Sequence, residues 1–137
     1  MEKSEAWRAL SQVTGEKLGE GTASQDVSFS FRLLECECGE TVLVPRLEHE
    51  PSSDPADFIG AMYIRCVECG RESLQLEITS DKHAHRIKEE PACARCGGRA
   101  FHLGSCDRYE DGGFFDCGIV MGYCPKCQES QTILKTD

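Results

Sequence analysis

Cysteines are the residues of this chain most able to do chemistry, and four of them frame its C-terminal part. The frame opens with Cys93-Ala94-Arg95-Cys96-Gly97 and closes with Cys124-Pro125-Lys126-Cys127. A Cys-x-x-Cys turn brings two sulfurs close together, and two such turns can surround one Zn²⁺ ion with a tetrahedron of thiolates. Glycine after the second cysteine suits the positive φ that ends such a turn. The spacing predicts a four-cysteine metal site at Cys93, Cys96, Cys124 and Cys127.

Nearly the same cysteine spacing occurs earlier in the chain. Cys38 precedes Cys66 by 28 positions, and Cys96 precedes Cys124 by 28 positions. A shift of 58 positions therefore superposes three cysteines of an earlier group on three of the later one. The fourth differs, because the earlier group begins with a shorter Cys-x-Cys turn, Cys36-Glu37-Cys38-Gly39. We expect a less regular metal site at Cys36, Cys38, Cys66 and Cys69, and a tandem repeat of one metal-binding unit.

Some of the remaining cysteines and histidines leave alternatives open. If Cys36 cannot reach the first metal, three histidines could replace it: His49, His83 and His85. The sequence Asp111-Gly112 favours a two-residue hairpin turn, which would place Cys106 opposite Cys117. There the two side chains could be small buried apolar groups, a cross-strand disulfide, a redox pair or part of a further metal site.

The size and composition of the chain favour two small units held by metal. It has 137 residues, ten of them cysteine, with 39% hydrophobic and 7% aromatic content. A unit of roughly 40–50 residues buries little apolar surface, and a structural metal is a common remedy. The predicted division is an N-terminal helix and loose segment at 1–26, a first unit at 27–80, a linker at 81–92 and a second unit at 93–137.

Each element expected within these units follows from a local pattern. Residues 4–18 read as a helix capped by Ser4, with Trp7 and Leu10 on one stripe, which either packs on its own domain or docks on a partner. Alternation of apolar and polar residues predicts strands at 27–34 and 73–79, and the other strands are placed as the partners that follow or precede the turns. The expected strands are 27–34, 41–47, 58–65, 73–79, 99–108, 114–123 and 132–135.

Two cysteine turns joined by a hairpin and followed by a third strand resemble the zinc-ribbon family, and the Cys-x-x-Cys-Gly and Cys-Pro-x-Cys turns are similar to those of rubredoxin. The resemblance covers residues 29–79 and 93–135. It implies a small metal-bound β fold, made of two tandem zinc-ribbon-like antiparallel units with a short N-terminal helix. It also implies two Zn²⁺ ions per chain, with iron as the less favoured metal.

The charge of the chain indicates which class of partner it favours. The net charge is −9, and residues 36–80 carry three arginines against nine carboxylates. Binding of nucleic acid usually needs a basic face, and only the second unit offers scattered cations. These cations are Arg95, Arg99, Arg108 and Lys126. The acidic balance favours a protein partner over nucleic acid.

These observations lead to one functional hypothesis and several alternatives. A closed four-cysteine site has no open position for a substrate, and serine-hydrolase and phosphate-loop motifs do not occur, so we expect a structural metal and no enzyme. The hypothesis is a zinc-binding protein-interaction module with a regulatory role, transcription-associated or as a phage- or plasmid-type adaptor. The alternatives are nucleic-acid binding through the second ribbon and rubredoxin-like electron transfer with iron. A third alternative is the role of a transcript-cleavage factor, because the acidic stretch 107–111 resembles the hairpin tip of those proteins.

Location and self-association are further expectations. The N-terminal residues carry no secretory signal, and no apolar run is long enough to cross a membrane, so we expect a cytoplasmic protein. In a reducing compartment, paired cysteines favour metal over a disulfide framework. Exposed edges of the ribbons would also permit a homodimer.

Overall fold

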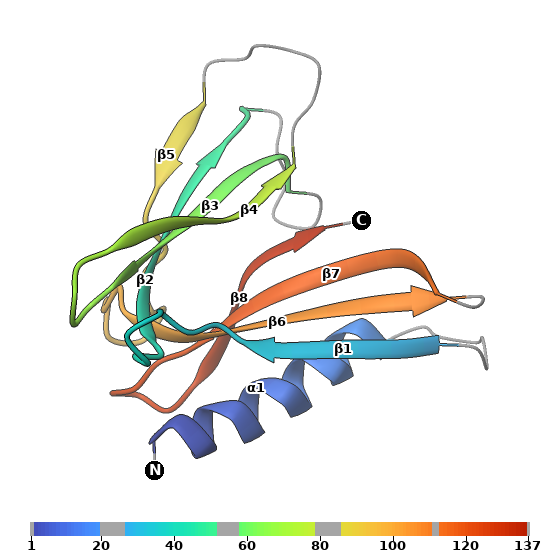
Figure 1. The fold of residues 1–137 in the computed structure, drawn as a ribbon, viewed down its shortest axis with the longest axis horizontal. Coiled ribbons are helices and arrows are strands. Elements are labelled where there is room, and N and C mark those ends of the chain that lie inside the picture. The colour runs from blue at the N-terminus through green and yellow to red at the C-terminus, as the bar shows by residue number, and fades with distance from the viewer. Residues whose placement is uncertain (1, 20–26, 52–57, 79–85, 111–112, 137) are drawn as a thin grey trace.

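The computed structural model describes residues 2–19, 27–51, 58–78, 86–110 and 113–136. Within these ranges the chain forms one helix and eight strands: α1 (Glu2–Gly19), β1 (Val27–Leu33), β2 (Val42–His49), β3 (Gly60–Cys66), β4 (Glu72–Ile78), β5 (Ile87–Glu89), β6 (Phe101–Glu110), β7 (Phe114–Tyr123) and β8 (Ser130–Thr136). The strands build one antiparallel sheet in the order β4-β3-β2-β6-β7-β8, with β1 paired to β6 and β5 paired to β2 (Figure 1).

The sheet consists of two halves that are joined by a short ladder. β2, β3, β4 and β5 form the first half, and β6, β7, β8 and β1 form the second. Only two residue pairs connect β2 with β6, Val42 with His102 and Leu43 with Phe101. Figure 1 shows the two halves diverging from the end of the molecule that carries the cysteine turns. The molecule is therefore one bent sheet.

The two halves pair their last strands in the same register, offset by 58 positions. Gly60 pairs with Ile78 where β3 meets β4, and Gly118 pairs with Thr136 where β7 meets β8. The irregularity in the first ladder falls between residues 62 and 63, and in the second between residues 120 and 121. A β-bulge bends and twists its strand, so both halves are bent at the equivalent point.

Two clusters of buried apolar residues hold the fold together. The larger cluster draws on both halves of the sheet and includes three cysteines of the metal-binding groups, Cys66, Cys93 and Cys124. The smaller cluster lies between α1 and the second half, where Leu10 and Leu18 of the helix meet Ile119 and Met121 of β7. Burying a side chain of this size stabilises the fold by about 1.5–3 kcal/mol. The second half thus has a layer of cover that belongs to it alone.

α1 differs from the sequence-based expectation at both ends. It begins at Glu2, so Ser4 lies inside the helix and the prediction that Ser4 caps it is wrong. It also continues through Gly15 to Gly19, because Thr14 and Leu18 on either side are buried against the sheet. This packing outweighs the cost of about 1 kcal/mol for glycine inside a helix. At Gly104 of β6 a side chain would meet Phe31 at 2.8 Å and Leu10 at 3.0 Å, so glycine allows α1 to approach the sheet.

Apart from β7, each predicted strand differs from its expected bounds by one or two residues at one or both ends. β2 runs on through Pro45 to His49, and its pairing on the edge away from β3 ends at Leu43 and resumes at Leu47. A proline in that interval does not interrupt this ladder. β5 lies in the segment predicted to be a linker. β1 precedes the first cysteine turn in sequence, yet it pairs with β6 of the second half.

No described helix combines the length and the apolar character that are needed to cross a membrane.

Candidate metal centres

Three of the four cysteine turns have the same backbone geometry. The N–H of the first cysteine donates to the carbonyl oxygen five residues later, as from Cys93 to Gly98 at 2.7 Å and from Cys66 to Arg71 at 3.0 Å. The carbonyl oxygen of that cysteine accepts a hydrogen bond from the N–H four residues later, as at Cys124 from Gln128 at 2.8 Å. These two bonds close the turn and direct both cysteine side chains to one side of it.

The Cys36 turn keeps this pattern although it is one residue shorter. Cys36 N–H donates to the Glu40 carbonyl oxygen at 2.9 Å, and Gly39 N–H donates to the Cys36 carbonyl oxygen at 2.8 Å. Each bond therefore spans one residue fewer than in the other turns. The missing residue shortens the loop between the two cysteines and leaves the hydrogen bonds that close it in place.

The turns bring eight cysteines together in two groups of four. Within each group the sulfur atoms lie within 4.8 Å of one another, and each group could hold one metal ion. We call them the first centre, formed by Cys36, Cys38, Cys66 and Cys69, and the second centre, formed by Cys93, Cys96, Cys124 and Cys127. Cys36, whose reach the sequence left open, is part of the first centre.

The distances between sulfurs fit a tetrahedral metal ion. In the first centre the Sγ atoms of Cys36 and Cys69 are 3.5 Å apart, as are those of Cys38 and Cys66. In the second centre two such distances are 3.9 Å and 3.7 Å, from Cys93 to Cys127 and from Cys96 to Cys124. Four sulfurs at ~2.3 Å from one Zn²⁺ ion are separated by roughly 3.8 Å in a regular tetrahedron. Both donor sets therefore match the size of the ion.

Backbone N–H groups in the turns favour the thiolate form of one cysteine in each centre. The N–H groups of Cys69 and then Glu68 lower the pKa of Cys66 to about 7. The N–H groups of Cys96 and then Arg95 likewise lower the pKa of Cys93 to about 7. In addition, Gly98 N–H lies 3.4 Å from Cys96 Sγ and Cys127 N–H lies 3.5 Å from Cys124 Sγ.

Further ionisation within a centre is opposed by the neighbouring sulfurs. The pKa of Cys127 is raised to about 12, first by its hydrogen bond with Cys96, then by burial, and then by Cys93 and Cys124. A bound dication would remove this opposition, because it attracts all four thiolates. Metal binding at each centre must then release protons.

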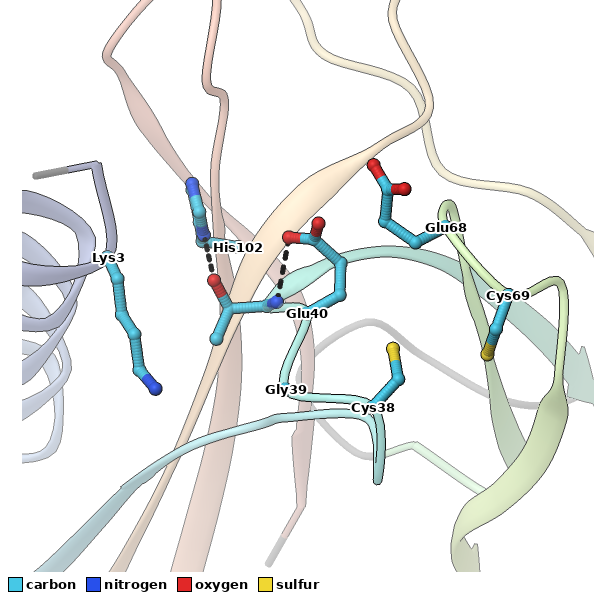
Figure 2. Close-up of a pocket in the computed structure, with 8 residues that line it drawn as sticks. Lys3, Cys38, Gly39, Glu40, Glu68, Cys69 and His102 are labelled. Atoms are coloured by element: carbon cyan, nitrogen blue, oxygen red, sulfur yellow. Dashed lines mark hydrogen bonds between the residues drawn. The ribbon is translucent and has the colours of Figure 1, made fainter.

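The two centres differ in exposure. Cys38 and Cys69 are exposed in the first centre, whereas Cys96 is the one exposed cysteine of the second. A cleft of about 590 Å³ opens beside the first centre, and Figure 2 shows Cys38 and Cys69 on its wall. Deeper in the cleft, the buried His102 ring lies 3.0 Å from the Thr41 hydroxyl through Nδ1, and Glu40 accepts a hydrogen bond from Thr41 N–H at 2.9 Å. Solvent can thus reach the sulfurs of the first centre more readily.

The histidines considered as substitutes do not join the first centre where they are described. His49 Nε2 lies 3.2 Å from Glu89 Oε2, and its Nδ1 lies 3.1 Å from the Glu50 carbonyl oxygen. His83 and His85 lie outside the described residues.

Cys106 and Cys117 are not opposite each other, and the prediction that they would be is wrong. Cys106 pairs with Ile119, and Cys117 pairs with Arg108. The turn at Asp111-Gly112, from which that register was derived, lies outside the described residues. The pairing nearest it, Glu110 with Phe114, is one residue away from the predicted register, and a shift between Arg108 and Tyr109 adds a second residue. Both cysteines are free and buried beneath α1, where desolvation raises the pKa of each thiol.

Arg108 has a role that sequence reasoning missed. Its side chain is only 13% exposed, and its guanidinium donates to the Leu18 carbonyl oxygen at 3.1 Å and to Glu110 at 2.5 Å. Asp116 lies 3.4 Å from its Nε. A cation at the last turn of a helix satisfies a free carbonyl group and interacts favourably with the helix dipole. Arg108 thereby fixes the end of α1 to the second half.

The other arginines proposed for a basic face are also paired. Arg95 lies 2.6 Å from Glu129, and Arg99 lies 2.9 Å from Glu90. With Arg108 buried among carboxylates, the one exposed cation of that set without an ion pair in the described residues is Lys126.

Comparison with family models, with curated proteins and with solved structures found no match for this chain. The likeness to zinc ribbons accordingly rests on the two four-cysteine centres.

Proposed function

We propose that this protein is a zinc-binding protein-interaction module in which two structural zinc ions, one at each centre, hold a single bent sheet. The observation that carries the proposal is the convergence of eight cysteines into two groups, each with its sulfurs within 4.8 Å of one another. Four thiolates fill the coordination sphere of Zn²⁺, so a metal in such a site supports the fold and offers no position to a substrate.

The placement of the centres supports a structural role. Cys66, Cys93 and Cys124 belong to the main apolar cluster, so their metal ions would be attached directly to the core. In small units of this kind the free energy of metal binding is largely free energy of folding. The fold, and with it the surface that would bind a partner, would then form only when zinc is bound.

Charge supports a protein as the partner. The chain carries a net charge of −9, and each four-thiolate zinc site adds about −2 to that. Arg95, Arg99 and Arg108 of the second half are engaged by carboxylates, which lowers the positive charge that this half could offer to a phosphate backbone. A regulatory role, in transcription or as a phage- or plasmid-type adaptor, is proposed from the resemblance to zinc ribbons.

Elemental analysis with a visible spectrum tests the metal part of the proposal. We expect two zinc ions per chain and no colour. Cys69→Ser, in the first centre, should reduce the content to one, and the matched control Cys106→Ser should keep two, because Cys106 lies outside both centres. Red protein with stoichiometric iron, retained after expression with excess zinc, would replace this proposal with electron transfer.

Titration with nucleic acid tests the partner class. The zinc-loaded chain should not bind random-sequence double-stranded DNA or single-stranded RNA at about 0.15 M salt. Proteins with an unpaired basic face bind such nucleic acids non-specifically, with micromolar to submillimolar dissociation constants, under these conditions. Binding that weakens steeply with salt, and that Lys126→Ala reduces, would overturn the choice of a protein partner.

A further inference from the structure

The sheet has edge strands, and one of them is unusually open to another chain. Within the described residues β1, β4, β5 and β8 each pair with a single strand. The free edge of such a strand presents unpaired N–H and C=O groups, which template pairing with another strand. Natural proteins block these edges with charge, with proline or with covering segments. An unblocked edge therefore indicates a place where another strand could pair.

Three of the four edges are blocked. β4 carries Glu72 and Glu77, each in an ion pair with an arginine. β5 has three residues, of which two are charged. At β8 the carbonyl oxygen of Lys135 accepts a hydrogen bond from Phe58 N–H at 2.9 Å, so the first half of the sheet already occupies part of that edge.

β1 lacks these devices. Its seven residues, Val27–Leu33, include no proline and one charged residue, Arg32. Ser28, Phe29 and Ser30 are all exposed in succession, so both faces of the strand are open at its centre. Figure 1 shows β1 at the margin of the second half, with α1 beside it.

An aromatic row accompanies this edge. Trp7 of α1 contacts Phe31 edge to face, with the ring centroids 5.6 Å apart. Phe29 lies two positions from Phe31 and therefore on the same face of the strand. Phe29 is 46% exposed and Trp7 is 53% exposed, which leaves a large apolar area beside an unpaired strand.

The order of residues in β1 fits a second copy of the same strand. If two β1 strands pair antiparallel about Ser30, the pairing includes all seven residues of each. Val27 then lies opposite Leu33, Phe29 opposite Phe31, and Ser28 opposite Arg32. Apolar residues meet apolar residues, and no like charges are opposed, which is the arrangement that stabilises cross-strand pairs.

From this symmetry we propose that β1 is a homodimerisation edge, and that two copies of the chain pair antiparallel through β1 with Ser30 on the twofold axis. Because Trp7 packs on Phe31, and Phe31 faces the partner's Phe29, each Trp7 would cover the exposed Phe29 of the other copy. In such a dimer the free edge of β1 would be paired and the exposed Phe29 would be covered, which neither is in a single chain. The contact is small, so its dissociation constant should be micromolar, ~10 µM.

Sedimentation equilibrium of the full zinc-loaded chain tests the edge. We expect a reversible dimer from about 1 to 200 µM, with the emission of the single tryptophan moving to shorter wavelength as the dimer forms. Ser30→Glu and Ser30→Lys should each be monomeric, because position 30 faces itself and like charges would meet. An equimolar mixture of the two should regain the dimer. Ser73→Glu on β4, also exposed, is the control and should dimerise like the wild type.

Cross-linking keeps the proposal testable should either charged variant fold poorly. Ser30→Cys should form a disulfide-linked dimer under diamide, because the two introduced thiols meet at the axis, whereas Ser28→Cys should not, because it faces Arg32. A wild-type chain that stays monomeric at the highest concentration would overturn the proposal. So would dimers that Ser30→Glu leaves intact, or equal cross-linking at positions 28 and 30. Metal content and circular dichroism of each variant separate these outcomes from loss of the zinc sites.

Discussion

The two halves of the sheet share their strand registers but differ in what covers them. β3 and β4 pair as β7 and β8 do, with the irregularity at equivalent positions. Yet α1 and β1 both pack on the second half, which therefore has a cluster of its own beneath Leu10 and Leu18. The first half shares the main cluster and has no second one in the described residues. The register of the paired strands is thus the same wherever the cysteine spacing is the same. The packing of each half depends on whether α1 and β1 cover it.

The two centres differ in a parallel way. The second has two complete Cys-x-x-Cys turns and one exposed cysteine, and the first has one shortened turn and two exposed cysteines. The more exposed centre belongs to the half with less cover. We infer that the second half is the more stable part of the molecule, and the following experiments test that ranking.

Loss of one ligand in each half should have the largest effect. Cys66→Ser should lose one zinc ion and the hydrogen-exchange protection of β2, β3 and β4, while α1, β6 and β7 stay protected, because their own cluster remains. Cys124→Ser should lose protection in both halves, since the first half would then lose its support. Hydrogen exchange with mass spectrometry measures both variants. Equal and global loss in the two would contradict the ranking.

Acidification should weaken zinc binding at both centres alike. The pKa values of Cys66 and Cys93, about 7, lie below the ordinary value of cysteine. Stability from these thiolates is therefore fully present above the ordinary cysteine pKa and is lost as the pH falls through about 7. Competition with one proton per site lowers zinc affinity about 100-fold over two pH units, and more protons lower it further. Chelator competition at a series of pH values measures this, and a different slope for the two centres would break the parallel.

Chelators should remove zinc from the first centre sooner. Cys38 and Cys69 are exposed beside the cleft, and solvent access speeds attack on a metal site, so we expect about a tenfold difference in rate. Release into a metallochromic dye should show two phases. Cys69→Ser should remove the fast phase and leave the slow one unchanged. The reverse assignment would show that exposure does not govern release.

Exchanging glycine and glutamine at equivalent turn positions should have the smallest effect on stability, and it compares the two centres most directly. Gly70 and Gln128 occupy equivalent positions 58 residues apart, with φ of 74° and 58°. A side chain at positive φ costs about 1–2 kcal/mol, less the entropy that glycine loses on folding. Gln128→Gly should therefore stabilise the protein by about 0.5–1 kcal/mol. Gly70→Gln should destabilise it similarly, since a Cβ there meets no described atom within 4 Å. Thermal unfolding of the zinc-loaded variants measures both.

The cysteine groups and most strands could be predicted because their signals are local. Cys-x-x-Cys spacing indicates directly which sulfurs share a turn. The strand predicted at 114–123 as the partner after the Asp111-Gly112 hairpin signal has the bounds of β7, Phe114–Tyr123. Alternation assigns residues to faces but names no neighbour, so it could not show that β1 pairs with β6. The register of Cys106 and Cys117 was extrapolated from a two-residue turn. The pairing nearest that turn, Glu110 with Phe114, is already displaced by one residue, and one extra residue on β7 between Phe115 and Cys117 displaces the register by another.

Arg108 shows another limit of sequence reasoning. In sequence it resembles the other scattered cations, and its burial depends on the end of α1 arriving from ninety positions away. Two nearby carboxylates are the signal that could have identified Arg108: Glu110, two positions along β6, and Asp116 on β7 across the hairpin.

The pairing of β1 with β6 also has a consequence for the order of synthesis. Residues 27–33 pair with residues 104–110, so more than seventy residues separate the partners along the chain. A ribosome completes α1 and β1 well before it has made the strands that cover them. During that interval Leu10, Leu18 and Phe31 have no sheet to pack on, and contacts this distant in sequence form slowly. These apolar side chains are then exposed during synthesis, and we expect a chain truncated before β7 to be insoluble.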